Sequence, residues 1–153
     1  MKKITLKIKE VYELFNELKG LKDPQTGQLI SKGLLEEKLL ISVKYSLDNL
    51  ADTLLAEIKK IEDLKQEAIK RLGKEDENGG IFLPMRVDEV FDEEGKLISA
   101  NVNPSFIEYQ KEIDELLNNE CVIEYREVTL DQLNIETEVN PHILFKLITS
   151  DES

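Results

Sequence analysis

Cys121 and His142 are the sole cysteine and the sole histidine among the 153 residues, and they are the first candidates for catalysis. A thiol and an imidazole within hydrogen-bond distance can act as a nucleophile and its general base. Cys121, however, alternates with charged residues in a predicted strand, which is typical of a small apolar side chain in a core. His142 is predicted in the first turn of a helix, where the helix dipole disfavours its protonated form. The sequence therefore predicts a protein that is not an enzyme, with a carboxylate-based active site as the alternative.

Acidic residues near the middle of the chain have the spacing that begins a calcium-binding loop. Asp76, Asn78 and Gly80 match that start, but such a loop needs glycine at its sixth position and glutamate at its twelfth. Ile81 and Val87 occupy those two positions. A structural zinc site needs about four cysteine or histidine ligands, which the chain lacks, and no phosphate-binding glycine loop is present. We expect no metal and no cofactor.

Charge is distributed unevenly along the chain, whose net charge is -12. Residues 1–73 contain 14 Lys and Arg against 12 Asp and Glu, whereas residues 74–153 contain 6 against 20, a net of -14. A field of that sign repels nucleic-acid phosphates and anionic lipid headgroups, so we expect neither nucleic acid nor membrane as a direct partner. It attracts a protein with a basic surface. The alternative is that excess acid keeps a small protein in solution.

Acidic side chains of the second half are the candidate interface residues. They come from the predicted hairpin and the last predicted strand: Glu89, Asp92, Glu93, Glu94, Glu124 and Glu127. Each of them can instead be ordinary solvent-exposed charge. A homo-oligomer is one form that the expected protein binding can take.

Most of residues 1–73 are predicted to be helical. Residues 4–8 alternate between apolar and polar, as in a half-buried strand, and residues 11–18 then follow helical spacing. Residues 23–27 contain the proline and glycine of a turn. Ser31 is predicted to cap the next helix, which runs without proline to Gly73. Its apolar stripe repeats about every 3.6 residues, as one helical face requires: Leu47, Leu50, Leu54, Ile58, Ile61, Leu64, Ala68 and Leu72.

The length of this helix has a consequence for the fold. An unbroken helix of about 40 residues would be about 60 Å long, which exceeds the width of a globular domain of this size. Part of the helix must therefore project or meet another chain.

Residues 74–153 are predicted to form a hairpin, a helix, a strand and a further helix. Ile81–Val90 and Lys96–Val102 are predicted as a β-hairpin closed by Asp92–Gly95, and Pro84 puts the first of these strands at a sheet edge. Asn103 and Asn140 each precede a proline, so each is predicted to cap a helix.

The first of these helices is predicted over Pro104–Asn118. A strand follows from Cys121 to about Val128, with a helical turn at Thr129–Leu133 before the terminal helix.

These elements define an α+β fold: one long amphipathic helix in a helical hairpin, a small antiparallel sheet and short C-terminal helices. We expect residues 1–153 to form a single domain, in which 1–73 are mainly helical and 74–153 form the acidic hairpin-helix-strand-helix region. A single cysteine, with no signal peptide and no long apolar run, indicates a cytoplasmic protein.

Several features follow one another in a distinctive order. A basic opening strand and a Lys/Glu-rich helical hairpin lead to the break at Asn78-Gly79-Gly80, and the run Phe106–Leu117 then leads into Glu120–Ile123. This layout resembles a group of small bacteriophage proteins of unassigned function. The resemblance implies a phage or prophage origin, a host-cytoplasmic location and a non-enzymatic role, and it carries over no catalytic residues.

Three functions are compatible with these observations. The first is a phage-type accessory protein that binds another protein through the long helix or the acidic half. The second is an acidic anti-defence or anti-host inhibitor that occupies a basic nucleic-acid-binding groove, and such binding weakens as salt is added. The third is a virion or assembly component, which purified particles would contain.

Overall fold

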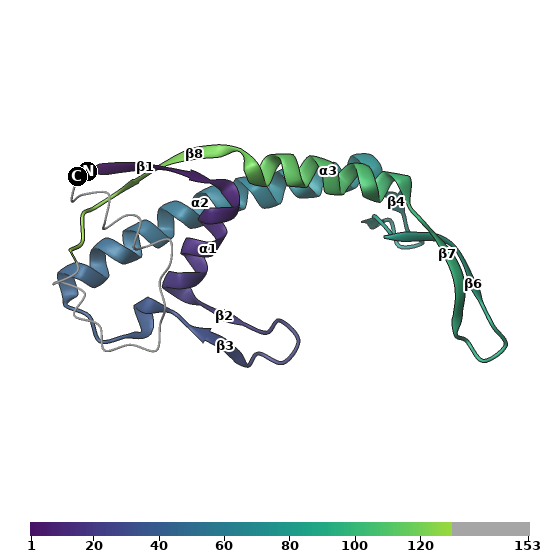
Figure 1. The fold of residues 1–153 in the computed structure, drawn as a ribbon, viewed down its shortest axis with the longest axis horizontal. Coiled ribbons are helices and arrows are strands. Elements are labelled where there is room, and N and C mark those ends of the chain that lie inside the picture. The colour runs from purple at the N-terminus through teal and green to yellow at the C-terminus, as the bar shows by residue number, and fades with distance from the viewer. Residues whose placement is uncertain (130–153) are drawn as a thin grey trace. The chain divides into compact units, whose positions relative to one another are not determined.

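The computed structural model describes residues 1–129 and is an α+β structure (Figure 1). The chain divides into two compact units: unit 1 comprises Met1–Lys59 and the chain from Asn118 onward, and unit 2 comprises Lys60–Leu117. The single domain expected from the sequence stays a prediction. The helical turn predicted to end at Leu133 and the terminal helix predicted after Pro141 lie outside the described residues.

The first and the last described strands both belong to unit 1, and they pair with each other. Strand β1 (Lys2–Lys7) runs antiparallel to strand β8 (Glu120–Tyr125), with Leu6 opposite Cys121. The backbone N–H of Lys7 donates to the carboxylate of Glu10 (3.0 Å), which supports the start of helix α1 (Ile8–Lys19). The strand and the helix predicted for residues 4–18 are confirmed, except that Ile8 already belongs to α1. The strand predicted from Cys121 to about Val128 is present but ends at Tyr125.

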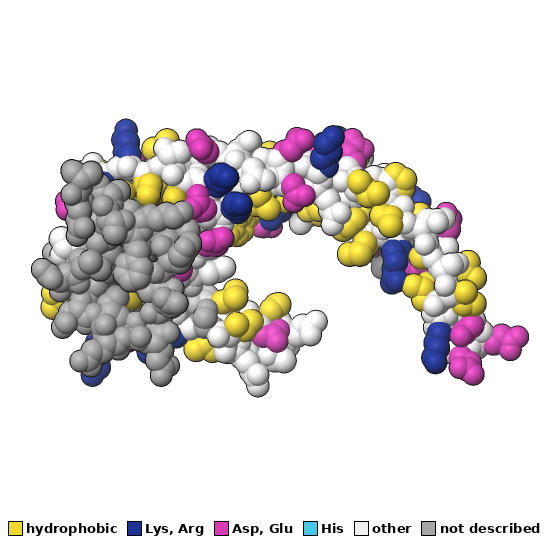
Figure 2. Space-filling view, in the orientation of Figure 1, with side chains coloured by type: hydrophobic (Ala, Val, Ile, Leu, Met, Phe, Trp, Pro, Cys, Tyr) yellow, Lys and Arg dark blue, Asp and Glu magenta, His cyan; other side chains and the backbone are white. Residues whose placement is uncertain are grey.

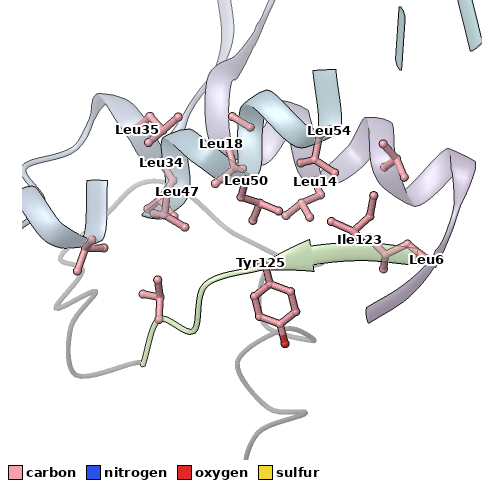
Figure 3. Packing of buried hydrophobic residues seen from close by; sticks show 14 residues of the cluster. Leu6, Leu14, Leu18, Leu34, Leu35, Leu47, Leu50, Leu54, Ile123 and Tyr125 are labelled. Carbon is pink, nitrogen blue, oxygen red and sulfur yellow. The ribbon is translucent and has the colours of Figure 1, made fainter. Parts of the chain in front are cut away.

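The hydrophobic core cluster of the described residues lies in unit 1. Figure 3 shows leucines of α1 and of the long helix α2 (Ile41–Leu72) facing Leu6 of β1 and Ile123 of β8. Residues of five elements and one loop contribute to the cluster: Leu6, Val11, Leu14, Leu18, Leu34, Leu35, Val43, Leu47, Leu50, Ala51, Leu54, Ile123, Tyr125 and Val128. Burial of this many large side chains is the main source of stability available to the unit.

The predicted start of the long helix at Ser31 is wrong. Ser31 belongs to strand β3 (Leu29–Lys32), which pairs with strand β2 (Gly20–Lys22) around the predicted turn, and the 3-10 helix η1 (Leu34–Glu36) follows. Residues 31–40 stay outside the long helix because of tertiary packing. Leu34 and Leu35 are both buried in the core, and this packing overrides helix propensity. Helix α2 begins only at Ile41.

Gly33 explains why the chain leaves a helical path at this point. A Cβ atom at Gly33 would lie 2.3 Å from the carbonyl carbon of Lys19 and 2.4 Å from the backbone nitrogen of Gly20. Contacts this short do not occur, so the backbone of η1 can approach the end of α1 only where no side chain is present. The residue that looks like a weak point in a helix is therefore a packing requirement.

Helix α2 ends, as predicted, just before Gly73, and most of its predicted stripe is buried or half-buried. The exception is Leu64, which is 49 % exposed. The helix has 32 residues, which corresponds to a length of about 48 Å. The division between the two units falls within it, at Lys59 and Lys60. Within residues 1–129 no helix is both long enough and apolar enough to span a membrane.

Unit 2 is built from the end of α2, two hairpins and helix α3 (Pro104–Asn118). The predicted hairpin is confirmed, although its first strand, β6 (Arg86–Phe91), starts later than expected and pairs antiparallel with β7 (Leu97–Val102). Residues 81–82 instead form strand β5 and pair with strand β4 (Lys74–Glu75). Helix α3 has the predicted bounds. The antiparallel pairing in the described chain therefore forms four two-stranded sheets rather than one small sheet.

We expect Gly33→Ala to lower the free energy of unfolding by about 1–3 kcal/mol, because the new methyl group must displace packed backbone. Urea denaturation followed by circular dichroism measures this change.

Gly27→Ala is the matched control, since Gly27 has φ 71° and a Cβ atom there would meet no other atom within 4 Å. Its cost is conformational and should be about 1 kcal/mol or less. A smaller loss for Gly33→Ala than for Gly27→Ala would contradict the close approach at Gly33.

Candidate functional site

Cys121 lies on β8 at the edge of the core and is half-buried. Burial raises the pKa of its thiol, and the negative charge of Glu57 raises that pKa further. A thiol with a raised pKa is a poor nucleophile at neutral pH, because the thiolate is the reactive form. The position agrees with the small core side chain predicted from the sequence. The second member of the predicted pair, His142, lies outside the described residues.

Asp76 and Asp92 have a structural task at the tips of the two hairpins of unit 2. One carboxylate oxygen of Asp76 accepts hydrogen bonds from the backbone N–H groups of Asn78 (2.9 Å) and Gly80 (2.8 Å). Asp92 does the same for Glu94 (2.9 Å) and Lys96 (2.8 Å). Each aspartate closes its own turn, and no group of three potential metal ligands occurs among the described residues.

The six acidic candidates fall into two groups that belong to different units. Glu89 lies on β6 with its carboxylate 3.5 Å from the guanidinium of Arg86, and Asp92, Glu93 and Glu94 form the tip of the hairpin in unit 2. Glu124 and Glu127 belong to unit 1.

Only one of the two candidates in unit 1 has a described ion pair. Glu124 on β8 lies 3.4 Å from the ammonium of Lys3, and Glu127 is exposed after the strand. All six side chains are exposed or only partly covered, but we assign them no common surface.

Apolar side chains on the β6–β7 hairpin are the feature that charge-based reasoning missed. Val90, Phe91, Leu97, Ile98 and Val102 are between 39 and 64 % exposed. Figure 2 shows hydrophobic side chains along this hairpin and acidic ones at its tip. The sequence holds a signal for this surface, because Val90-Phe91 and Leu97-Ile98 are adjacent apolar pairs. Neighbouring residues of a strand point to opposite faces, so such pairs give a two-stranded hairpin two apolar faces.

Unit 2 buries almost none of its apolar residues. Ile61 and Ala68 are its only buried hydrophobic residues, and helix α3 buries none. By contrast, large apolar side chains that are more than a third exposed come from every part of the unit: Leu64, Ile81, Phe82, Met85, Val90, Phe91, Leu97, Ile98, Val102 and Ile107. An isolated two-stranded hairpin is at best marginally stable in water. Unit 2 therefore exposes more apolar surface than a soluble protein usually leaves uncovered.

Asn103 fixes the base of the hairpin to α3. It is only 6 % exposed, and its amide nitrogen donates to the carbonyl of Pro84 (2.8 Å). Its side-chain oxygen accepts from the backbone N–H of Ser105 (3.1 Å), and its own N–H donates to the carbonyl of Met85 (3.0 Å). The residue predicted as an N-cap thus caps α3 and also holds the segment just before β6 against the end of β7. This arrangement holds the hairpin at a defined place within unit 2.

A groove of about 370 Å³ lies between α2 and α3 in unit 2. The guanidinium of Arg71 forms an ion pair with the carboxylate of Glu112 across it, and that hydrogen bond raises the pKa of Arg71. Leu64, Ala68, Ile113 and Leu116 provide its apolar lining. Among the residues that the structure describes, no buried side-chain nitrogen or oxygen lacks a hydrogen-bond partner. The groove therefore presents no unsatisfied polar group for a ligand.

A smaller hollow of about 200 Å³ lies in unit 1 beside Tyr45. The guanidinium carbon of Arg126 lies 5.2 Å from the centre of the Tyr45 ring, a cation–π contact. Glu124 also lines the hollow. Its two charged side chains both have described contacts, Glu124 with Lys3 and Arg126 with Tyr45.

Comparisons with protein-family models, with curated proteins and with solved structures found no match for this chain. The fold and its surface therefore define the class: a small α+β protein with one well-packed unit and one unit that exposes an apolar hairpin.

We expect Cys121 in the folded protein to react with iodoacetamide more slowly at about pH 7.5 than it does in urea, because its thiolate is disfavoured. The rate should still be rising at pH values above the ordinary thiol pKa of about 8.5, where the rate for an unperturbed thiol levels off. The raised pKa stabilises the fold below that ordinary value, and this contribution is lost as the pH rises through the folded pKa. Mass spectrometry of the alkylated protein gives the rates.

Glu57→Gln is the control for this measurement. Removing the negative charge should move the rate profile towards lower pH, whereas equal rates in the folded and unfolded protein at every pH would contradict the position of Cys121.

Asp92→Ala should weaken the hairpin more than Glu93→Ala, although both substitutions remove one negative charge from the tip. Asp92 loses two hydrogen bonds to the turn, so hydrogen-exchange protection of residues 86–102 should fall about three- to ten-fold. Glu93→Ala should leave protection within about two-fold of the original, as surface substitutions generally do. Equal losses in the two variants would show that charge, and not the turn, decides the stability of the hairpin.

Proposed function

We propose that this chain is a non-enzymatic, phage-type accessory protein that acts by binding protein through the apolar β6–β7 hairpin. The observation that carries the proposal is that unit 2 exposes far more of its large apolar side chains than it buries. That unit buries only Ile61 and Ala68 among its hydrophobic residues but exposes five apolar side chains on one hairpin. Soluble proteins keep such continuous apolar surface mainly where something covers it.

The energetics of the hairpin support the same proposal. Full burial of a Val, Leu, Ile or Phe side chain contributes about 1.5–3 kcal/mol, so covering five half-exposed ones contributes roughly 4–7 kcal/mol. Association itself costs about 4–15 kcal/mol. Binding therefore needs more than these side chains, and a hairpin with open strand edges can add main-chain hydrogen bonds to a partner strand.

The acidic residues have a secondary place in this proposal. Asp92, Glu93 and Glu94 lie at the tip of the apolar hairpin, where they suit a partner whose apolar groove has a basic rim. The alternative, an inhibitor that imitates nucleic-acid charge, requires the acidic residues to act as one surface. The phage origin and the host cytoplasm rest on the layout of the sequence, and a place in the virion is the third alternative.

Affinity capture from a host-cell lysate tests the proposal with two variants of the same hairpin. One removes apolar side chains and the other removes negative charge. The first replaces Val90, Phe91 and Ile98 by serine on the apolar hairpin. The second replaces Glu93 and Glu94 by glutamine at its tip. We expect the wild-type protein and the tip variant to retain the same proteins at about 500 mM salt, because apolar contacts persist when charges are screened. The serine variant should lose them.

Other results of this capture contradict the proposal. Retention of the same proteins by the serine variant would remove the hairpin from the binding surface. Binding that disappears in high salt and in the glutamine variant would instead favour the acidic inhibitor.

A further inference from the structure

The two strands of the hairpin have very different edges. Strand β6 contains Arg86, Asp88 and Glu89, and Asp88 has φ 53°, a backbone conformation that interrupts regular pairing. Strand β7, with the sequence Leu-Ile-Ser-Ala-Asn-Val, contains no charged residue. Charges and irregular backbone are the usual means by which an edge strand avoids further pairing. The edge of β6 has both charged residues and an irregular backbone, whereas β7 has no charged residue to prevent further pairing.

The edge of β7 is also open. Among the described strands β7 is hydrogen-bonded to β6 alone. Both faces of the hairpin are exposed at Phe91, Leu97 and Ile98. A strand that joined the edge of β7 would therefore complete main-chain hydrogen bonds and cover apolar side chains in one step.

We propose that the edge of β7 pairs antiparallel with β7 of a second copy of this chain, so that two hairpins form one four-stranded sheet about a two-fold axis. This inference rests on the proposed function, because it names the partner of the same hairpin. A two-fold interface brings a surface onto itself. The uncharged β7 edge can face a copy of itself without placing like charges opposite each other.

The charge of unit 2 is compatible with such a dimer because of where the charges lie. Unit 2 has 8 Lys and Arg against 15 Asp and Glu, a net of -7, so two copies repel each other at long range. Antiparallel pairing would put the two acidic tips, Asp92–Glu94, at opposite ends of the new sheet. Six residues of strand separate them by about 20 Å, roughly twice the Debye length at 0.1 M salt. Salt should therefore strengthen the dimer, whereas it weakens the binding of a basic partner.

The size of the surface sets the expected strength. Pairing at the edge of β7 covers part of its three exposed apolar side chains, Leu97, Ile98 and Val102. This is on the order of 200 Å² of apolar area per copy, about a quarter of what a standard stable interface buries on each side. We therefore expect association that depends on protein concentration in the micromolar range rather than an obligate dimer. Ile81, Phe82 and Met85 remain available to other partners.

A cysteine scan of the full chain tests the pairing. In a Cys121→Ser background, single cysteines replace Leu97, Ser99, Ala100 or Asn101 in β7. Asp88 and Glu89 of β6 provide the matched controls. An antiparallel two-fold pair brings only the residues next to the axis within disulfide distance. We expect one or two adjacent β7 positions to give at least ten-fold more covalent dimer, on mild oxidation and a non-reducing gel, than either β6 control.

Analytical ultracentrifugation of the protein without added cysteines provides the second measurement. Its mass should rise above 17.6 kDa with concentration and rise further with added salt. Ser99→Lys, which puts a charge on the edge, should abolish the rise, and Ser99→Thr should retain it. A constant mass of one chain, or cross-linking that is equal along β6 and β7, overturns the inference.

Failure of this inference differs from failure of the proposed function. A pure protein that stays monomeric, but whose serine variant loses the captured lysate proteins, contradicts the second copy and keeps the hairpin as a binding surface. The opposite result is a pure protein that dimerises through β7, while its serine variant still retains the same lysate proteins. That result supports this inference and contradicts binding of other proteins through the hairpin.

Discussion

Antiparallel pairing of β1 with β8 brings the two ends of the described chain together, and the packing of unit 1 depends on it. The two strands contribute Leu6 of β1 and Ile123 and Tyr125 of β8 to the core that α1 and α2 help to form. A two-stranded sheet this small is not stable alone, so it must lie against α1 and the first half of α2 to persist. The contacts are long-range in sequence, which makes the core of unit 1 a property of the whole chain.

Burial is therefore concentrated in one part of the molecule. Unit 1 contains the core cluster, whereas unit 2 holds its shape mainly by local means: aspartate-closed turns, the Asn103 hydrogen bonds and the regular backbone of α3. Local hydrogen bonds each contribute only about 0.5–1.5 kcal/mol, so a structure built on them gains much from being covered. This difference in burial is the reason for proposing unit 2 as the part of the chain that binds protein.

Much of the fold could be predicted because its signals are local. The stripe of α2, the Asn103-Pro104 start of α3 and the turn at Asp92–Gly95 each arise from neighbouring residues. Each agrees with the structure, apart from the exposed Leu64 of the stripe. The start of α2 could not be predicted, because the burial of Leu34 and Leu35 and the close approach at Gly33 depend on contacts with α1. No sequence window contains that information.

The candidate site was predicted only in part, for a related reason. Charge is visible residue by residue, so the acidic residues of the hairpin stand out, but exposure of an apolar side chain depends on what the fold leaves uncovered. Val90, Phe91 and Ile98 look like ordinary core residues of a strand until the structure shows each of them at least half exposed.

The acidic tip and the apolar strands of the hairpin belong to one physical arrangement. An apolar, β-prone segment that stays exposed risks unspecific association, and flanking charges limit this risk. Asp92, Glu93 and Glu94 are placed where they repel disordered stacking of many hairpins, because stacked tips would bring the acidic groups of neighbours together. An antiparallel pair keeps the tips apart. The charge asymmetry of the chain can therefore select the geometry of an apolar contact without itself being the contact.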